Sequence, residues 1–199
     1  MTSPSRDDFA ALAGRFTVVP VWRELLADLT TPVAAFGRLA GGDPGDRAFL
    51  LESVEHAERW GRWSFIGRRP SATLVARGRS VTVEGSLPAG VPVDRGVLAA
   101  VDAILAAYRS PVIDQLPPFY SGLVGYLGYD VVREVERLPG APADELGYPD
   151  AILSVVGQVA AYDYWRQRVT LIDAVPIPAG AADDRGALDR LYDDAIARL

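Results

Sequence analysis

The sequence predicts an α+β fold, built largely from antiparallel sheet with helices interspersed among the strands. Three observations predict it. Segment 73–83 has the pattern of a hairpin, with Gly78 near its turn. Segments 151–161 and 168–174 are strand-like and are joined by a short polar and aromatic turn. Helical spacing of apolar residues is clearest over 97–108, between strand-like stretches.

The N-terminal part is predicted to contain an extended segment and two helices. An extended entry over 19–21 leads into a short helix that ends near Asp28. Thr31 then caps a second helix that has Pro32 at its first position, where the missing N–H costs nothing. A turn rich in glycine over 41–45 ends it. The expected apolar face of this second helix comprises Val33, Phe36 and Leu39.

Two strands and a helix are predicted next. Alternating residues over 49–53 and a short apolar run over 63–66 each indicate a strand. The helix after the hairpin starts behind Asp94, which we expect to be its cap. Its apolar stripe comprises Val97, Leu98, Val101, Ile104, Leu105 and Tyr108.

The C-terminal half is predicted to alternate between strands and loops. Segment 120–129, rich in glycine and aromatic residues, is typical of a buried central strand where backbones approach closely. A short helix over 131–136 and a proline-rich loop over 138–149 follow. A last amphipathic helix has no Gly or Asn after it, so we expect the natural protein to continue. The apolar residues of that helix are Leu188, Leu191, Tyr192, Ala195 and Leu199.

Composition excludes several classes of function. Hydrophobic residues make up 49% of the 199 residues and charged residues 23%, which is typical of a globular protein. A net charge of -6 argues against nucleic acid as a partner. The sequence has no lysine and no cysteine, which excludes a Schiff base, a P-loop lysine, disulfides and thiolate metal sites. With no signal-peptide pattern and no bilayer-length apolar run, a cytoplasmic location is expected.

The residues that carry acid–base chemistry do not form a recognisable catalytic or metal-binding motif. His56 is the only histidine, and it lies in an acidic stretch without a nucleophile motif. Glu52, Glu55 and Glu58 are close in sequence, but a solvated acidic loop accounts for the last two. We therefore predict no catalytic residue and no metal site in this chain.

Two further patterns favour structural roles. Glycines recur every three residues over 122–128, but no phosphate-binding context follows them, so they indicate close packing. Arginines at 59, 62, 68 and 69 are interleaved with two tryptophans, an arrangement that can bind single-stranded nucleic acid. The acidic surroundings favour a structural role instead, or recognition of a small ligand's carboxylate by one arginine.

Three stretches of the chain resemble anthranilate synthase component I, in the same order as in that family. One contains the tetrapeptide Leu-Leu-Glu-Ser at 50–53 and runs on through Glu-Arg-Trp-Gly-Arg-Trp-Ser-Phe-Ile-Gly at 58–67. A second, at 118–133 with 136–139, contains Gly-Leu-Val-Gly-Tyr-Leu-Gly-Tyr-Asp-Val-Val-Arg. The third covers 19–33. Three separate long matches are unusual by chance, and they imply the N-terminal part of the chorismate-utilising enzyme fold.

The resemblance implies a role in sensing L-tryptophan. In that family the Leu-Leu-Glu-Ser string contributes to the allosteric tryptophan site, so Ser53 is the best candidate ligand-binding residue, with Glu52 beside it. Arg62 is given a supporting role because the family often has a basic residue downstream. A carboxylate can neutralise the ammonium of a free amino acid, and a hydroxyl or guanidinium can bind its carboxylate.

The resemblance also implies that the catalytic machinery lies elsewhere. Residues 1–175 would be the N-terminal region, and 176–199 a linker and the start of a helix leading into an absent chorismate-binding domain. That domain would supply the catalytic histidine and glutamates, the Mg²⁺ site and a strand that completes the tryptophan pocket. This chain alone would then have no cofactor and no lyase activity. The whole enzyme converts chorismate and ammonia to anthranilate and pyruvate, and a glutamine amidotransferase subunit, component II, delivers the ammonia.

Alternatives remain open at this point. Component I of aminodeoxychorismate synthase, in the folate pathway, has a similar N-terminal region. A free-standing amino-acid-binding module would bind tryptophan by itself. A simple interaction domain would use its glycine–tyrosine strand to pack against another chain. The first alternative predicts a different product of the whole enzyme. The second predicts measurable tryptophan affinity of this chain by itself, and the third predicts no ligand binding and a stable complex with another chain.

Overall fold

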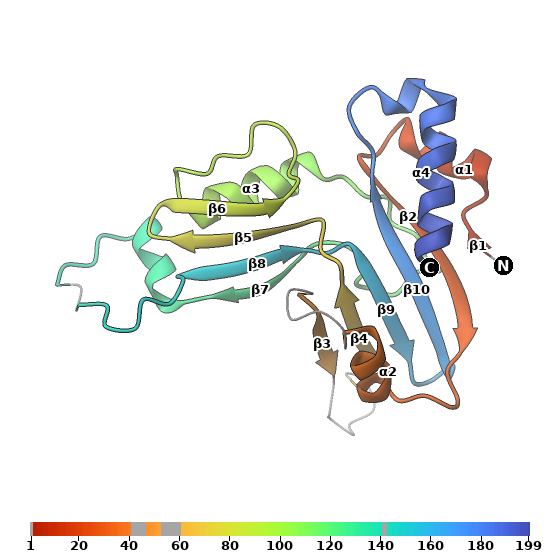
Figure 1. Cartoon of the computed structure of the whole chain (residues 1–199), viewed down its shortest axis with the longest axis horizontal. Helices are drawn as coiled ribbons and strands as arrows, with labels where there is room; N and C mark the ends of the chain where they lie inside the picture. Colours follow the sequence, from red (N-terminus) through yellow and green to blue (C-terminus); the bar gives the residue numbers. More distant parts are fainter. Residues whose placement is uncertain (1, 41–46, 53–60, 141–142) are drawn as a thin grey trace. The chain divides into compact units, whose positions relative to one another are not determined.

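The computed structural model describes residues 2–40, 47–52, 61–140 and 143–199 (Figure 1). The chain forms two compact units that interleave along the sequence. The first unit comprises Met1–Pro70, Tyr108–Gly122 and Val156–Leu199, and the second comprises Ser71–Ala107 and Leu123–Val155. Every strand pairing in the described part of the chain is antiparallel, which confirms the predicted α+β class.

A six-stranded sheet forms the centre of the first unit, in the order β1-β2-β10-β9-β4-β3. Its long strands β2 and β10 pair over nine residues each, so they provide a rigid support for the rest. The strands of this sheet are β1 (Thr2–Ser3), β2 (Val18–Leu26), β3 (Phe49–Glu52), β4 (Trp63–Arg68), β9 (Gln158–Asp163) and β10 (Arg168–Pro176).

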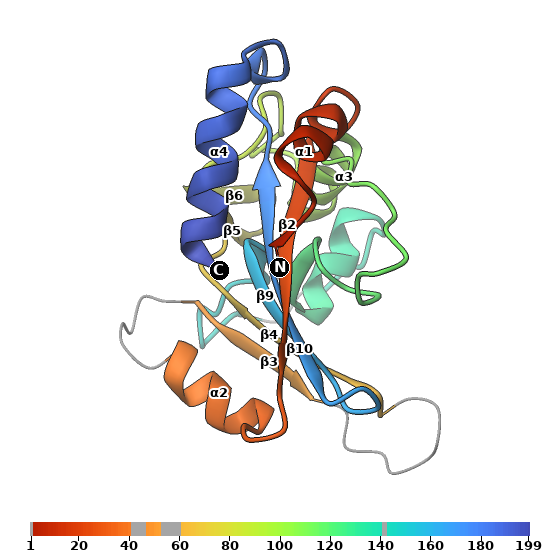
Figure 2. The same ribbon diagram turned by 90° about the vertical axis from the view of Figure 1, so that its right-hand side faces the viewer.

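Two helices, α1 (Arg6–Ala13) and α4 (Arg185–Arg198), cover one end of the long strands. Figure 2 shows them near one end of β2 and β10, with α2 near the other. Phe9 and Tyr192 pack together with ring centroids 5.4 Å apart, against Val19 and Val21 of β2. The final helix was predicted correctly, and it packs within the first unit; whether a further domain follows it stays a prediction.

Helix α2 (Pro32–Leu39) confirms the predicted cap but not the whole predicted face. The Thr31 hydroxyl accepts a hydrogen bond from the Ala34 N–H at 3.2 Å, as an N-cap residue does. Ala35 is buried against the sheet, with Phe36 and Leu39 packed around it, whereas Val33 is 57% exposed. The prediction for Val33 was wrong because the helix turns Ala35, and not Val33, toward the sheet.

The short helix predicted to end near Asp28 is instead the second half of strand β2. Leu25 and Leu26 pair with Val169 and Arg168 of β10, and both leucines are more than 40% exposed. Apolar residues two to four apart fit a helix and a strand equally well over so short a run. Pairing with a distant strand decides the outcome here.

The second unit contains a four-stranded sheet in the order β6-β5-β8-β7. The predicted hairpin is confirmed: β5 and β6 pair, and Gly78 in the turn has a φ of +54°, a conformation that glycine adopts without strain. The segment predicted as one strand over 151–161 divides at Val156-Gly157 into β8 and β9, which belong to different sheets. The strands of the four-stranded sheet are β5 (Ala72–Arg77), β6 (Ser80–Gly85), β7 (Leu123–Leu127) and β8 (Ala151–Val155).

Helix α3 (Val97–Ala107) confirms the predicted helix but has a different cap. The predicted apolar stripe was wrong at Leu105, which is 56% exposed. The carboxylate of Glu134 accepts hydrogen bonds from the backbone N–H groups of Val97 at 2.7 Å and Leu98 at 3.0 Å. Glu134 lies in the 3₁₀ helix η1 (Tyr129–Glu134), which is the short helix expected over 131–136, shifted by two residues. The expectation for Asp94 was wrong, because a carboxylate distant in sequence satisfies these donors.

Strand β7 lies at the edge of its sheet, so the prediction of a buried central strand was wrong. Tyr126 and Leu127 are 44% and 51% exposed. The predicted close approach of backbones is nevertheless present at Gly125, where a Cβ atom would lie 1.9 Å from the carbonyl oxygen of Ile152. The glycine is required for packing against β8, whatever covers the other side of the strand.

Candidate functional site

The candidate site lies at the end of the six-stranded sheet where β3 finishes. Glu52 is opposite Ser64 of β4, and Ser64 is opposite Tyr162 of β9. Directly opposed residues in an antiparallel sheet point to the same face. These side chains therefore form a row on one face of the sheet, from an exposed carboxylate to a buried hydroxyl and a buried phenol.

Tyr164 connects the two ends of this arrangement. Its hydroxyl lies 3.0 Å from the buried Ser64 hydroxyl and donates to the Glu52 carboxylate at 3.3 Å. Tyr164 follows directly after β9, and its backbone N–H donates to the Arg62 carbonyl oxygen at 3.0 Å. The first residue after the strand thus orients the carboxylate at the end of β3.

A half-buried ion pair lies at the same end of the sheet. The Arg62 guanidinium donates to both carboxylate oxygens of Asp163, from Nε at 2.9 Å and from Nη2 at 2.5 Å. Asp163 is opposite Trp63 in the strand register, and Trp63 precedes Ser64. Since neighbouring residues of a strand point to opposite faces, the Asp163 and Glu52 carboxylates leave the sheet on opposite faces.

The environment of Asp163 stabilises its charged form. Burial by itself raises the pKa of this carboxyl group, but the hydrogen bonds and charge of Arg62 lower it, as do backbone N–H bonds from Arg166 and Trp165. Together they outweigh burial, and the pKa of Asp163 lies below its usual value. The same pairing raises the pKa of Arg62. Both groups therefore stay ionised at neutral pH.

Arg62 also stacks between two indole rings. Its guanidinium carbon lies 4.7 Å from the centroid of Trp63 and 4.9 Å from that of Trp165. Cation–π contacts of this kind fix the plane of the guanidinium. Trp165 is 65% exposed, so one large aromatic surface at this end of the sheet faces solvent.

An open hollow of about 520 Å³ lies at the same end of the first unit. It is bounded by the loop 27–31 with Pro32 on one side and by Tyr162, Asp163, Tyr164 and Gln167 on the other. Pockets for small molecules commonly have volumes of about 300–1,000 Å³. Its size is thus compatible with a ligand as large as an aromatic amino acid.

Two of the three predicted site residues, Glu52 and Arg62, lie in the described part of the chain. Glu52 and Arg62 both lie at this end of the sheet, but they bind different partners, Tyr164 and Asp163. Ser53 lies outside the described residues, so its predicted role in binding stays a prediction, as do those of Glu52 and Arg62. His56 and Glu58 lie outside them as well.

The sequence reasoning missed Asp163, Tyr164 and Trp165. They occupy the end of β9 and the turn that follows it, a segment that was recognised only as polar and aromatic. Their role follows from the strand register, because β9 pairs directly with β4 and so carries them to Arg62 and Ser64. An acidic residue flanked by aromatic residues at a hairpin turn was the available signal.

Two expected features can be compared with the described part of the chain. Among those residues no group of three or more His, Cys, Asp or Glu side chains could hold a metal ion. None of the helices found in the same ranges is long and apolar enough to cross a membrane.

Comparison with known proteins identifies the relationship. The chain is 43% identical over 195 residues to anthranilate synthase component 1 of Mycolicibacterium smegmatis, covering 98% of this chain and 36% of that protein. The chain is homologous to part of anthranilate synthase component 1. The anthranilate synthase components 1 of Mycobacterium tuberculosis and Arthrobacter globiformis are 42% and 40% identical, over 98% and 99% of the chain. No protein-family model matches.

The match covers an N-terminal region, as the order of the motifs indicated. The chain spans little more than a third of the length of these relatives, 36% to 37%. Among solved structures, anthranilate synthase component I of Streptococcus pneumoniae TIGR4 aligns with a TM-score of 0.47 and 20% identity, covering 88% of this chain and 36% of that one.

Proposed function

We propose that this chain is the regulatory and scaffold portion of an anthranilate synthase component 1, and that it contributes to an allosteric L-tryptophan site. The observation that carries the proposal is the 40% to 43% identity to proteins of that name over nearly the whole chain. The longer protein would convert chorismate and ammonia to anthranilate and pyruvate. Component II, a glutamine amidotransferase, would supply the ammonia.

The site residues fit the chemistry of a free amino acid. Glu52 is exposed at the end of β3 and is oriented by Tyr164, so its second oxygen is available to an ammonium group. Ser53, the next residue, would bind the ligand through its hydroxyl. Arg62 would act in support, since its stacking and its pair with Asp163 order the neighbouring Trp63 and the turn after β9.

Catalysis would belong to the remainder of the longer protein. We propose that the chorismate site and the Mg²⁺ ion lie there, and that this chain alone has no lyase activity. The single histidine of the chain, His56, lies in no nucleophile motif, which supports this part of the proposal. A measurable conversion of chorismate to anthranilate by the 199-residue chain would contradict this part of the proposal.

Calorimetric titration with L-tryptophan tests the regulatory role. It is made on this chain and on the full-length protein, each as wild type, Ser53→Ala and Glu52→Gln. We expect saturable binding to the full-length protein that each substitution weakens about tenfold or more, because each removes a hydrogen bond to the ligand, charge-assisted for Glu52. The matched control is Glu136→Gln, which removes the charge of an exposed carboxylate in the second unit.

Analogues separate the two ends of the ligand. Tryptamine lacks the carboxylate and indole-3-propionate lacks the ammonium, so Glu52→Gln should weaken binding of tryptamine but not of indole-3-propionate. If tryptophan neither binds the full-length protein nor inhibits its formation of anthranilate, the regulatory role is wrong. A full-length protein that forms aminodeoxychorismate would overturn the assignment to anthranilate synthase.

A further inference from the structure

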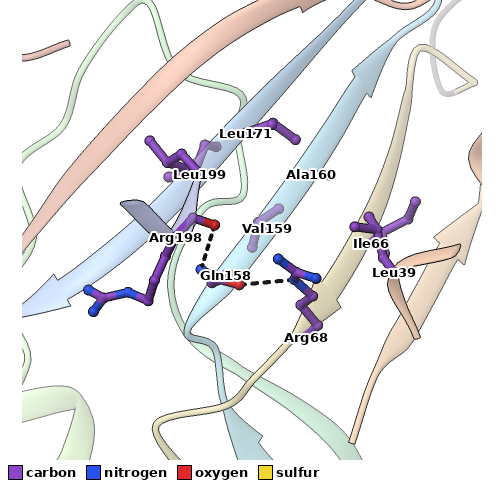
Figure 3. Close-up of a pocket in the computed structure, with 10 residues that line it drawn as sticks. Leu39, Ile66, Arg68, Gln158, Val159, Ala160, Leu171, Arg198 and Leu199 are labelled. Atoms are coloured by element: carbon purple, nitrogen blue, oxygen red, sulfur yellow. Dashed lines mark hydrogen bonds between the residues drawn. The ribbon is translucent and has the colours of Figure 1, made fainter. Parts of the chain in front are cut away.

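A second pocket lies on the helix-covered face of the first unit, between α2 and the end of α4 (Figure 3). Its volume is about 70 Å³. The walls come from elements far apart in the sequence, and the residues that define its character are Leu39, Ile66, Arg68, Gln158, Leu171 and Leu199. None of them belongs to the row that contains Glu52, and this pocket shares no residue with the hollow beside Tyr162 and Tyr164.

The greater part of the pocket is apolar. Ile66 is 1% exposed and Ala160 is 5% exposed, and together with Leu171 they form a floor contributed by three neighbouring strands. Leu39 of α2 and Leu199 close two sides, and the backbone oxygen of Leu199 accepts a hydrogen bond from Arg23. Apolar walls of this kind favour a ligand with a hydrocarbon body.

One end of the pocket is polar and ordered by Gln158, a side chain only 7% exposed. Its Oε1 accepts from Arg68 Nε at 3.0 Å, and its Nε2 donates to the Arg198 backbone oxygen at 3.3 Å. Figure 3 shows these two bonds and the Arg68 guanidinium beside Gln158. The glutamine thus holds the arginine in one orientation.

The charge of this end is positive. Arg198 is paired with the buried Asp173, Nε to Oδ2 at 2.6 Å, so its charge is balanced. Arg68 differs, because its hydrogen-bond partner in the described part of the chain is the neutral Gln158. Its Nη1 and Nη2 groups keep their N–H donors in a planar arrangement that suits two oxygens of a carboxylate.

We propose that this pocket binds a short aliphatic monocarboxylate, with its carboxylate on Arg68 and its hydrocarbon chain on Ile66, Ala160 and Leu171. The volume limits the part of the ligand that the pocket holds: at 10–15 Å³ for each water-sized group, about 70 Å³ holds about five to seven. The bound part of the ligand therefore has about five to seven non-hydrogen atoms. A cation is repelled by Arg68, and an inorganic phosphate leaves the apolar floor without contact.

Methyl NMR titration of the ¹³C-labelled 199-residue chain with sodium butyrate tests this proposal. The expected result is saturable shifts at the methyl groups of Leu39, Ile66 and Leu171 at millimolar concentrations. Butyramide has the same shape without the charge, and we expect it to bind at least about tenfold more weakly, since the charge-assisted bonds are lost. Inorganic phosphate, at the same ionic strength, should not produce these shifts.

Variants locate the carboxylate. Arg68→Met keeps the length of the side chain and should weaken butyrate binding about tenfold or more. Arg69→Met removes the same charge from the adjacent, exposed residue and should leave binding within about twofold, because it lies outside the pocket. The proposal is overturned if butyrate gives no saturable shift, if butyramide or phosphate binds equally well, or if Arg68→Met binds as the wild type does. The comparison of ligands uses the wild-type chain, so it does not depend on the folding of a variant.

Discussion

Breaking the ion pair between Arg62 and Asp163 should destabilise the first unit substantially. Asp163 is 5% exposed and receives four hydrogen bonds: two from Arg62 and one each from the backbone N–H groups of Trp165 and Arg166. Asp163→Asn keeps the shape of the side chain but removes its charge. It also turns an acceptor oxygen into an NH₂ group, so one donor loses its partner.

The magnitude follows from the exposure of the two partners. Removing one partner of a fully buried pair costs about 3–5 kcal/mol. Arg62 is 27% exposed, and water can solvate part of its guanidinium once the carboxylate charge is lost. We therefore expect Asp163→Asn to lower the free energy of unfolding by about 2–3 kcal/mol. Arg62→Met should cost about 3 kcal/mol, because it leaves the less exposed carboxylate without its cation.

Urea denaturation followed by tryptophan fluorescence measures this loss. All four tryptophans lie in the segments of the first unit, so their emission reports on that unit. The matched control is Glu24→Gln, which breaks the Arg168–Glu24 pair on the same sheet, where both side chains are more than 40% exposed. Such an exposed pair contributes about 0–1 kcal/mol. If Asp163→Asn cost no more than the control, our account of the pair would be refuted.

The pH dependence gives an independent check of the same pair. The pKa of Asp163 is lower in the folded than in the unfolded chain, so its stabilisation is complete above the unfolded value and is lost as pH falls through the folded value. An unfolded aspartate has a pKa of about 3.9. The difference between wild type and Asp163→Asn should therefore be constant from about pH 7 to pH 5 and shrink below that. A difference that grows on acidification would contradict the lowered pKa.

Three other predictions concern separate parts of the chain. Gly125→Ala should lower the free energy of unfolding of the second unit by about 2 kcal/mol or more, measured by circular dichroism, because the new Cβ meets the Ile152 carbonyl oxygen. In the control, Gly37→Ala, the new Cβ meets nothing within 4 Å, so the substitution should stabilise its helix by about 0.5–1 kcal/mol. Glu134→Ala should lower the free energy of unfolding by about 1–2 kcal/mol and increase amide hydrogen exchange only in the first turn of α3. Equal exchange in the variant and in the wild type would exclude the capping role. Burial raises the pKa of Asp173 despite the ion pair with Arg198. Asp173→Asn should therefore lower the free energy of unfolding, measured by urea titration, by less at pH 7 than at pH 4. A larger loss at pH 7 would show that the pKa is not raised.

Much of the fold could be predicted wherever a local signal was sufficient. The hairpin of β5 and β6, the start of α2 at Thr31-Pro32 and the position of α3 all depend on residues within a few positions of each other. Such signals act in the unfolded chain as well, so one segment is enough to recognise them. The candidate site was predicted less fully: Glu52 and Arg62 were selected, but Asp163 and Tyr164, which contact them, were not.

The sequence by itself determined the α+β class, the positions of most elements and the relationship to anthranilate synthase component 1. Tertiary structure decided that Leu25 and Leu26 extend a strand, that β8 and β9 enter different sheets, and that Asp163 meets Arg62. Each of these outcomes depends on which distant strand pairs with which, in which register. Strands a hundred residues apart pair through backbone hydrogen bonds, and nearly every residue can form these bonds. Local sequence patterns therefore do not identify which strand is the partner.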